Sequence, residues 1–283
     1  MDLVRTVSCS LTRFFRVPID CVARHEGGLS FEISSPVFDK GKGVRLVIRR
    51  PYKHMVVANA EFDAFASHLI QVWNRADRST IENALRYLNC FSNRMDIDAR
   101  IAEQKLEMSE GSIEAIRSLS TPSSFSLRIR STIGDELDEQ CVFEIAQCAY
   151  GFLLMLSGVL SEITDQNAEE FDNEGALKQT SLTRYERSAR NRALCIAANG
   201  TTCAVCGFDF AKRYGAFAAG YIEVHHKQPL STIGHSHSID PIKDLVPLCP
   251  NCHAAVHMKN PPISPEELRE IVANQSGDMN EDS

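Results

Sequence analysis

The sequence lacks the features that direct a chain out of the cell or into a membrane. Its first residues carry scattered arginines and no apolar core of the kind that a secretion signal needs. The longest weakly charged run, 141–160, is interrupted by Glu144 and Gln147 and so falls short of the ~20 apolar residues of a membrane span. We therefore expect a cytoplasmic protein in which this run forms a buried helix.

The first 160 residues also lack recognisable catalytic loops. They contain no glycine-rich loop that would hold a phosphate, no GxSxG turn and no paired-carboxylate signature. A chain of 283 residues is nevertheless long enough for two domains, and 43% apolar and 24% charged residues are ordinary for a globular protein. The residues that carry chemistry are expected in the C-terminal part.

Disulfides are also not expected, although the chain has ten cysteines. Four of them stand in two CxxC pairs, Cys203 with Cys206 and Cys249 with Cys252, and such short turns let two thiolates reach one metal. Four thiolates complete a closed, structural Zn²⁺ site. A reducing compartment fits this better than a disulfide framework does, and the other six cysteines read as small buried hydrophobes. A redox role for one pair is the alternative.

The strand and helix patterns predict an α+β fold. Alternation of apolar and polar residues predicts strands at 28–33, 44–49 and 125–130, and residues 1–60 as a whole read as mostly β. Helical spacing of apolar residues follows over 62–73.

A second helix is expected from Ser79, with Glu82 as its capping-box partner, and a long apolar helix over 136–160. Residues 92–120 are polar and expected to be helical in part. Strand followed by helix thus occurs twice, which leaves open an internal duplication or a common α+β unit.

The acidic stretch 161–183 has the composition of a linker, because it contains few large apolar residues. It separates an N-terminal domain, 1–160, from a C-terminal domain, 184–275, and residues 276–283 are expected to be a disordered tail. The C-terminal domain begins with a basic helix whose predicted C-cap is Gly200.

The net charge of −7 is distributed unevenly. Residues 1–60 hold 10 Lys and Arg against 5 Asp and Glu, and residues 184–260 hold 9 against 5. These basic segments could supply a phosphate-binding surface, whereas solvated strand arginines are the alternative. The candidate nucleic-acid-binding residues are Arg45, Arg49, Arg50 and Lys227.

Four histidines accompany the cysteine pairs. His225 and His226 end a β-like run, and neighbouring side chains on a strand point to opposite faces, so the two do not easily share an ion. His253 and His257 lie one helical turn apart and can face the same ion. The simplest assembly is a metal held by His225, His253 and His257, with His226 left as the general base. Purely structural histidines are the alternative.

The order CxxC, EVHHKxPL and DLVPLCPNCHxxVH resembles the HNH endonucleases, in particular the McrA-type and restriction-associated proteins. The resemblance covers about 184–260 and implies a zinc-stapled ββα-metal domain. It also implies His226 as general base and His225 and His253 as metal ligands. His257 extends it, because colicin-type DNases of the same superfamily carry two histidines four residues apart on this helix.

The family pattern has an asparagine before this helix, about where the present chain has Asp244. Asp244 is therefore a candidate catalytic residue that would steady the loop carrying the base, through its carboxylate or its backbone, and Asn251 is a nearby alternative. Glu223 shares a strand face with His225 and either contacts the metal through water or is simply solvated. Two further histidines lie in a polar loop and are expected to be exposed: His235 and His237.

By resemblance, the protein is expected to be a metal-dependent DNA endonuclease in restriction or antiviral defence, and its dependence on DNA modification is left open. Its cofactors would be structural Zn²⁺ and one catalytic divalent ion, which could be Mg²⁺, Mn²⁺, Ni²⁺ or Zn²⁺. Its partner would be double-stranded DNA, and no association with a membrane is expected. A homodimer would let two sites cut both strands. Residues 1–160 would recognise the target or mediate assembly. A non-catalytic zinc module and an RNase are the alternatives.

Overall fold

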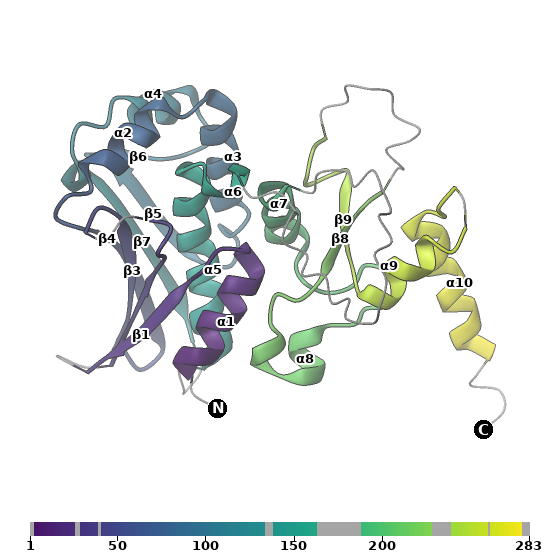
Figure 1. Cartoon of the computed structure of the whole chain (residues 1–283). Helices are drawn as coiled ribbons and strands as arrows, with labels where there is room; N and C mark the ends of the chain where they lie inside the picture. Colours follow the sequence, from purple (N-terminus) through teal and green to yellow (C-terminus); the bar gives the residue numbers. More distant parts are fainter. Residues whose placement is uncertain are drawn as a thin grey trace, which may run out of the picture.

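Antiparallel strands in the first half of the chain form one large sheet, and a small hairpin follows in the second half. This is the architecture of a computed structural model (Figure 1). We call residues 3–162 the sheet unit and residues 188–278 the hairpin unit. The predicted linker falls almost wholly outside the described residues, as do His235 and His237. The structure describes residues 3–25, 29–38, 41–133, 138–162, 188–227, 239–259 and 261–278.

The sheet has the order β1-β2-β3-β4-β7-β5-β6, and its neighbouring strands are antiparallel. β7 comes last in the sequence yet lies between β4 and β5. Its residues Phe125, Leu127 and Ile129 are buried and alternate with more exposed ones, as strand geometry requires. The strands are Asp20–Arg24 (β1), Ser30–Ser34 (β2), Val44–Tyr52 (β3), Met55–Phe62 (β4), Asp96–Ile101 (β5), Gln104–Lys105 (β6) and Phe125–Thr132 (β7).

Helices cover one face of this sheet, and α5 (Glu139–Leu156) is central among them (Figure 1). Its residues from Val142 to Leu156 are buried with the exception of Glu144, so α5 is core on nearly all sides. Trp73 packs edge-on against Phe62 and Phe125. The remaining helices of the unit are α1 (Leu3–Phe15), α2 (Ser67–Arg75), α3 (Arg78–Asn89), α4 (Glu110–Arg117), the 3-10 turn η1 (Pro122–Ser124) and α6 (Val159–Glu162).

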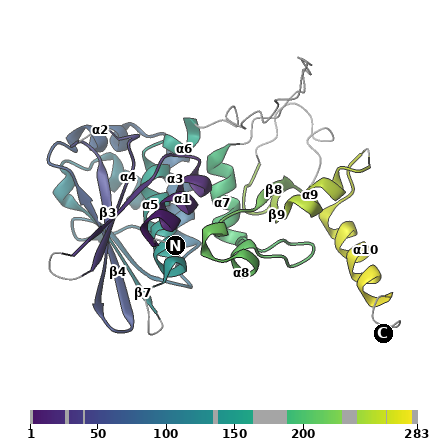
Figure 2. The same ribbon diagram turned by 60° about the horizontal axis from the view of Figure 1, so that its bottom comes forward.

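The hairpin unit lies against the helical layer, on the side away from the sheet (Figures 1 and 2). Strands β8 (Glu223–His226) and β9 (Leu245–Leu248) pair antiparallel, with His225 opposite Val246. The first turn of α9 follows β9 directly, so the hairpin and this helix form a continuous ββα unit. The helices are α7 (Ala189–Asn199), α8 (Phe210–Tyr214), the 3-10 turn η3 (Ala216–Ala218), α9 (Pro250–Val256) and α10 (Pro265–Asp278).

One arginine joins the two units at their boundary. The guanidinium of Arg192, on α7, donates to the carbonyls of Phe14, Gly220 and Ile222 at 3.0, 3.2 and 3.0 Å and lies over the Phe14 ring. Burial lowers the pKa of Arg192 to about 10, which still leaves it charged at neutral pH. It therefore fixes the chain that enters β8 against α1 of the sheet unit.

The structure confirms the α+β fold class and several predicted elements. The strand predicted at 125–130 is β7, and the helix predicted over 136–160 is α5 with α6. Gly200 caps α7 with φ 77°, a conformation that favours glycine.

Two expectations were wrong in detail. Residues 1–60 are not mostly β at their start, because Leu3–Phe15 is an amphipathic helix that buries Leu11, Phe14 and Phe15. The helix predicted from Ser79 begins at Arg78, and its cap is Asp77, whose carboxylate accepts from Thr80 N at 2.6 Å. The polar segment 92–120 is helical in part, as expected, at α4, and it also contains strands β5 and β6.

Within the described residues, no helix is both long enough and apolar enough to cross a membrane. Helix α5, which holds the longest apolar run of the sequence, is buried inside the sheet unit, as the sequence predicted. Helix α10 extends to Asp278, three residues beyond the predicted domain end at Gln275.

Gly151 tests the packing of α5. An added Cβ there would lie 2.3 Å from the hydroxyl of buried Tyr87, which itself donates to Gln147 O. We expect Gly151→Ala to lower the free energy of unfolding by about 1–3 kcal/mol through overpacking, in spite of its better helix propensity. Urea denaturation measures this change in the free energy of unfolding. The control Gly111→Ala, whose Cβ meets only the end of the Gln104 side chain, should be neutral or stabilising; equal effects would contradict this packing.

Candidate metal centre

The four cysteines of the two CxxC pairs converge on one point. Their sulfur atoms all lie within 4.8 Å of one another, and Cys206 Sγ is 3.7 Å from Cys249 Sγ. Bonds of about 2.3 Å at tetrahedral angles place two zinc-bound sulfurs about 3.8 Å apart, so the cluster fits Zn²⁺. The first pair lies in the turn after α7, while Cys249 caps α9 and Cys252 is in its first turn.

The local backbone explains how each pair turns so tightly. Gly207 has φ 71°, and its N–H donates to Cys203 O at 2.9 Å, which closes the first turn. In the second, Cys249 Sγ accepts from Cys252 N while Pro250 starts the helix. The two turns are tied together by Ala204 N, which donates to Pro247 O at 2.9 Å.

The thiols cannot all ionise without a cation. Burial opposes ionisation of Cys203, but the backbone N–H groups of Cys206 and Cys249 outweigh it and lower the pKa of Cys203 to about 7. Burial and the neighbouring sulfurs raise the pKa of Cys252 and of Cys249. Cys203 thus has a lowered pKa beside two thiols with raised pKa values. A divalent metal bound to these sulfurs would stabilise their thiolate forms.

Three histidines form a second cluster on the hairpin and α9. Ligand atoms of His225, His253 and His257 lie within 4.8 Å of one another. Their ring centroids are 5.2, 5.0 and 5.1 Å apart, and each pair of rings is nearly perpendicular. Three imidazoles that converge edge-on can bind one ion and leave further positions for water or substrate.

His253 shows most clearly that this cluster suits a metal. Its Nδ1 contacts the Glu223 carboxylate, and its Nε2 is buried with no hydrogen-bond partner in the described structure. A carboxylate on one imidazole nitrogen fixes the tautomer that leaves the other nitrogen as a ligand. Glu223 therefore acts on His253, whereas the sequence suggested contact with the metal through water or simple solvation.

His226 follows His225 and, by strand alternation, faces the opposite side of β8. The end of this strand is held by Lys227 N, which donates to Asp244 O at 2.9 Å. The Asp244 carboxylate accepts from Asp240 N at 2.8 Å and so closes the turn before β9. Asp244 thus steadies the segment next to His226 through its backbone, with its carboxylate used inside the turn. Asn251 is exposed in the second CxxC turn.

The sheet unit reaches this same turn. Arg86, on α3, donates to the Asp240 carboxylate at 2.7 Å, while inside the hairpin unit Asn199 on α7 donates to Ile242 O at 3.3 Å. Sequence patterns gave no signal for Arg86, because a contact across 154 residues leaves no local periodicity.

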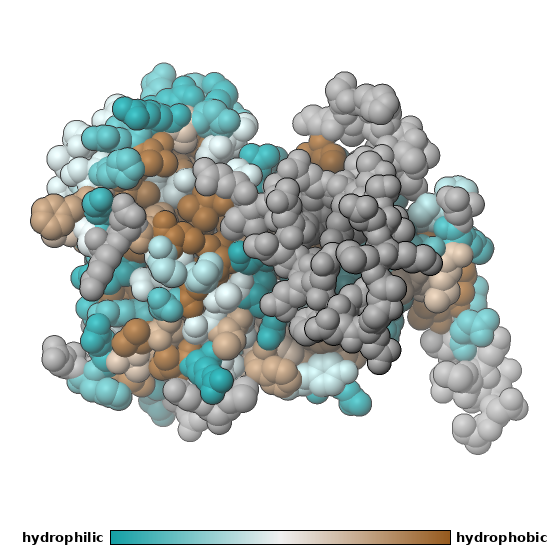
Figure 3. Space-filling model, viewed as in Figure 1, coloured by the Kyte–Doolittle hydropathy of each residue, from teal (hydrophilic) through white to brown (hydrophobic). Residues whose placement is uncertain are grey.

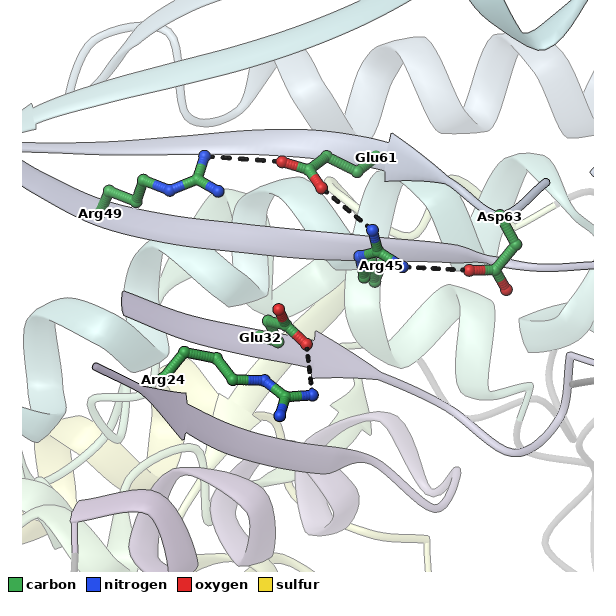
Figure 4. A network of polar contacts seen from close by, with 6 residues as sticks. All are labelled: Arg24, Glu32, Arg45, Arg49, Glu61 and Asp63. Atoms are coloured by element: carbon green, nitrogen blue, oxygen red, sulfur yellow. Dashed lines mark hydrogen bonds and ion pairs between the residues drawn. The ribbon is translucent and has the colours of Figure 1, made fainter. Parts of the chain in front are cut away.

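Two of the arginines suggested for nucleic-acid binding, Arg45 and Arg49, lie on the sheet face that α5 does not cover (Figure 4). Arg45 pairs with Glu61 at 3.2 Å and with Asp63 at 3.3 Å, and Arg49 approaches Glu61 at 3.5 Å. Arg50 donates to the carbonyl of Lys53. The exposed face therefore carries paired charges, and Lys227, beside His226, is the candidate that lies close to the histidines.

Comparison with known proteins gives one match. Residues 203–259, about a fifth of the chain, match the family model described as HNH endonuclease. The chain contains an HNH domain. Its match includes both CxxC pairs and the four histidines. A comparison with curated proteins and one with solved structures gave no match. The McrA-type subgroup stays a prediction.

Zinc analysis tests the thiolate cluster. We expect Cys203→Ser to lose one equivalent of zinc per chain and to unfold the HNH domain, because structural zinc sites contribute directly to folding. Elemental analysis and circular dichroism measure the two effects. Cys9→Ser alters an exposed cysteine outside the cluster and should keep its zinc. Retention of zinc by the Cys203 variant would rule out this site.

The Glu223–His253 contact makes a separate prediction. Glu223→Gln should weaken Mn²⁺ or Ni²⁺ binding about 10- to 100-fold, because His253 loses the carboxylate that orients it. Calorimetric titration measures the change in Kd. Glu266→Gln, on exposed helix α10, serves as the control with unchanged affinity. Equal Kd values for all three proteins would show that Glu223 does not orient the ligand.

Proposed function

We propose that this protein is a metal-dependent endonuclease that hydrolyses phosphodiester bonds in double-stranded DNA. The unpartnered Nε2 of His253, between two other imidazoles, is the observation that carries the proposal. The HNH domain supports a nuclease function in general. The choice of DNA over RNA, a role in restriction or antiviral defence, dependence on modified bases, and a cytoplasmic location are inferences from the sequence resemblance.

Each residue has a role in the proposed reaction. His225, His253 and His257 hold the divalent ion, which when bound supplies positive charge to the phosphoryl group. His226 accepts a proton from the attacking water, since a neutral imidazole with pKa near 6.5 suits this task. Asp244 positions His226 through the bond to Lys227 N. The four thiolates hold structural Zn²⁺ and take no part in the chemistry.

The sheet unit is proposed to govern assembly or target choice. Strand β3, which carries Arg45 and Arg49, is separated from the hairpin unit by the helical layer (Figures 1 and 2). Their pairing with acids offers little free positive charge. Apolar and hydrophilic residues are mixed over the visible surface of this unit (Figure 3). These features favour contact with a second protein, including another copy of the chain, over phosphate binding by that face.

His226→Ala separates the enzyme from a non-catalytic zinc module. We expect plasmid cleavage with Mg²⁺, Mn²⁺ or Ni²⁺ to fall at least about 100-fold, because the general base is removed. Zinc content and circular dichroism should not change. His68→Ala, at an exposed position of α2, should cleave normally. Cleavage that survives in the His226 variant, or is absent from the wild type, would favour the zinc module, and preference for RNA would favour an RNase.

Arg86→Ala tests whether the sheet unit positions the HNH domain. Loss of its bond to Asp240 should loosen the turn that holds Lys227, and lower the single-turnover rate about fivefold, equivalent to ~1 kcal/mol. The Kd for the catalytic metal should stay the same. Arg78→Ala removes ion pairs to Glu82 and Glu110 inside the sheet unit and should leave the rate unchanged. Matching rates in both variants would mean that the contact only joins the units.

A further inference from the structure

The large sheet has one face that no helix covers within the described part of the chain (Figures 1 and 2). Leu46 and Ile48 of β3 belong to the core under the helices, whereas Arg45 and Arg49 point to the other side. We call this uncovered side the open face. An antiparallel sheet can leave such a face in water, so its charges decide whether a partner fits.

The strand register arranges the open face in rows that run from β1 to β5. One row consists of Val22, Glu32, Val47, Asn59, Arg128 and Asp98. The neighbouring row consists of Arg24, Ser30, Arg49, Val57, Arg130 and Asp96. In a third row, Arg45 is opposite Glu61. With about 4.8 Å between neighbouring strands, the face is about 24 Å wide.

These rows are self-complementary in charge. Consider a second copy related by a two-fold axis that runs parallel to the strands, between β3 and β4, in the plane of contact. The second sheet then lies face to face with the first in reversed strand order, so β2 faces β7 and β3 faces β4. Glu32 meets Arg128 of the second copy, and Arg45 meets Glu61. The symmetry makes each of these contacts twice.

The remaining positions of the two complete rows bring no like charges together. At the outer strands, Arg24 faces Asp96 of the second copy. The other contacts each involve at least one uncharged side chain, and they join Val22 to Asp98, Ser30 to Arg130, Arg49 to Val57 and Val47 to Asn59.

Other placements of the axis are disfavoured by like charges. An axis through β3 would place Arg49 against Arg49 of the second copy, and Arg45 against Arg45. An axis through β4 would place Arg49 against Arg130, and Glu32 against Asp98. An axis along the first row, perpendicular to the strands, would place Glu32 against Glu32. Like charges repel across a contact, so of these arrangements the axis between β3 and β4 fits best.

Arg128 is the residue of the open face that most needs an acid from outside its own chain. It is exposed and donates to the neutral side chain of Asn59 at 3.0 Å, and no ion pair joins it to an acid among the described residues. In contrast, Arg45 lies 3.2 Å from Glu61 of its own chain. Surface ion pairs contribute little free energy each, so we expect a weak contact that is sensitive to salt.

We propose that the open face is the contact surface of a homodimer in which two sheets pack face to face. The helical layer separates each sheet from its hairpin unit (Figures 1 and 2), so the two HNH domains lie on the outer sides of this dimer. The dimer therefore joins two metal centres without bringing them together. This inference rests on the assembly role proposed for the sheet unit and is independent of the nuclease chemistry.

Sedimentation velocity on the full chain, without DNA, tests the dimer. We expect wild-type protein in about 50 mM NaCl to dimerise with Kd of about 1–100 µM, at the weak end for a small polar contact. About 500 mM NaCl should raise this Kd at least about tenfold, because salt screens the ion pairs. A wild-type chain that stays monomeric at about 200 µM in low salt would overturn the proposal without any variant.

A pair of charge reversals tests the two-fold arrangement. Arg128→Glu places an acid against Glu32 of the second copy, and Glu32→Arg places an arginine against Arg128, so each variant alone should raise Kd at least about tenfold. An equal mixture of the two variants should dimerise again, because each contact then joins an acid to an arginine. Arg5→Glu, an exposed reversal on α1 at the covered side of the sheet, should dimerise as wild type. Circular dichroism checks that all variants fold.

Two further outcomes would contradict this surface. Equal dimerisation of wild type and Arg128→Glu would place the contact on another face. A mixture of the two folded variants that stays monomeric would show that Glu32 and Arg128 do not meet. Either result overturns the proposal, and neither bears on the nuclease activity, because no DNA is present and no cleavage is measured.

Discussion

Convergence of four thiolates is the constraint on which the C-terminal half depends. Cys203 and Cys206 follow α7, whereas Cys249 and Cys252 begin α9, so one ion bound by all four would fix two segments that are more than 40 residues apart. The start of α9 cannot then shift relative to the hairpin. His253 and His257 are carried by this helix and His225 by the hairpin, so the geometry of the imidazoles follows from the geometry of the sulfurs.

The second constraint is the packing of the hairpin unit onto α5. That helix fills the core of the sheet unit on one side and presents a polar stripe on the other. Three arginines cross the boundary: Arg192 donates to carbonyls on α1 and before β8, Arg94 to Ala197 O, and Arg86 to the Asp240 carboxylate. The HNH domain is therefore held at its first helix, at the entry to β8 and at the turn before β9.

Residue spacing was sufficient to predict which cysteines and which histidines come together. A CxxC turn and a pair of histidines four apart restrict geometry locally, and two such features need only be brought together. Strand β7 was predictable from its alternation of apolar and polar residues, and helix α5 from the length of its apolar run. Helix α1 was missed although its apolar residues recur at helical spacing, because the segment was read together with the strands that follow it; the residues are Leu3, Val4, Val7, Leu11, Phe14 and Phe15. The contact of Glu223 with His253 and that of Arg86 with Asp240 follow from tertiary packing, which spacing does not encode.

The carbonyls bound by Arg192 have a consequence for the order in which the molecule is made. The N-terminal sheet unit leaves the ribosome first, and Phe14 O is already in place when α7 and the entry to β8 are synthesised. The imidazole-bearing strand is thus docked onto a preformed surface. A truncated or misfolded front half would leave the hairpin and its histidines without that support.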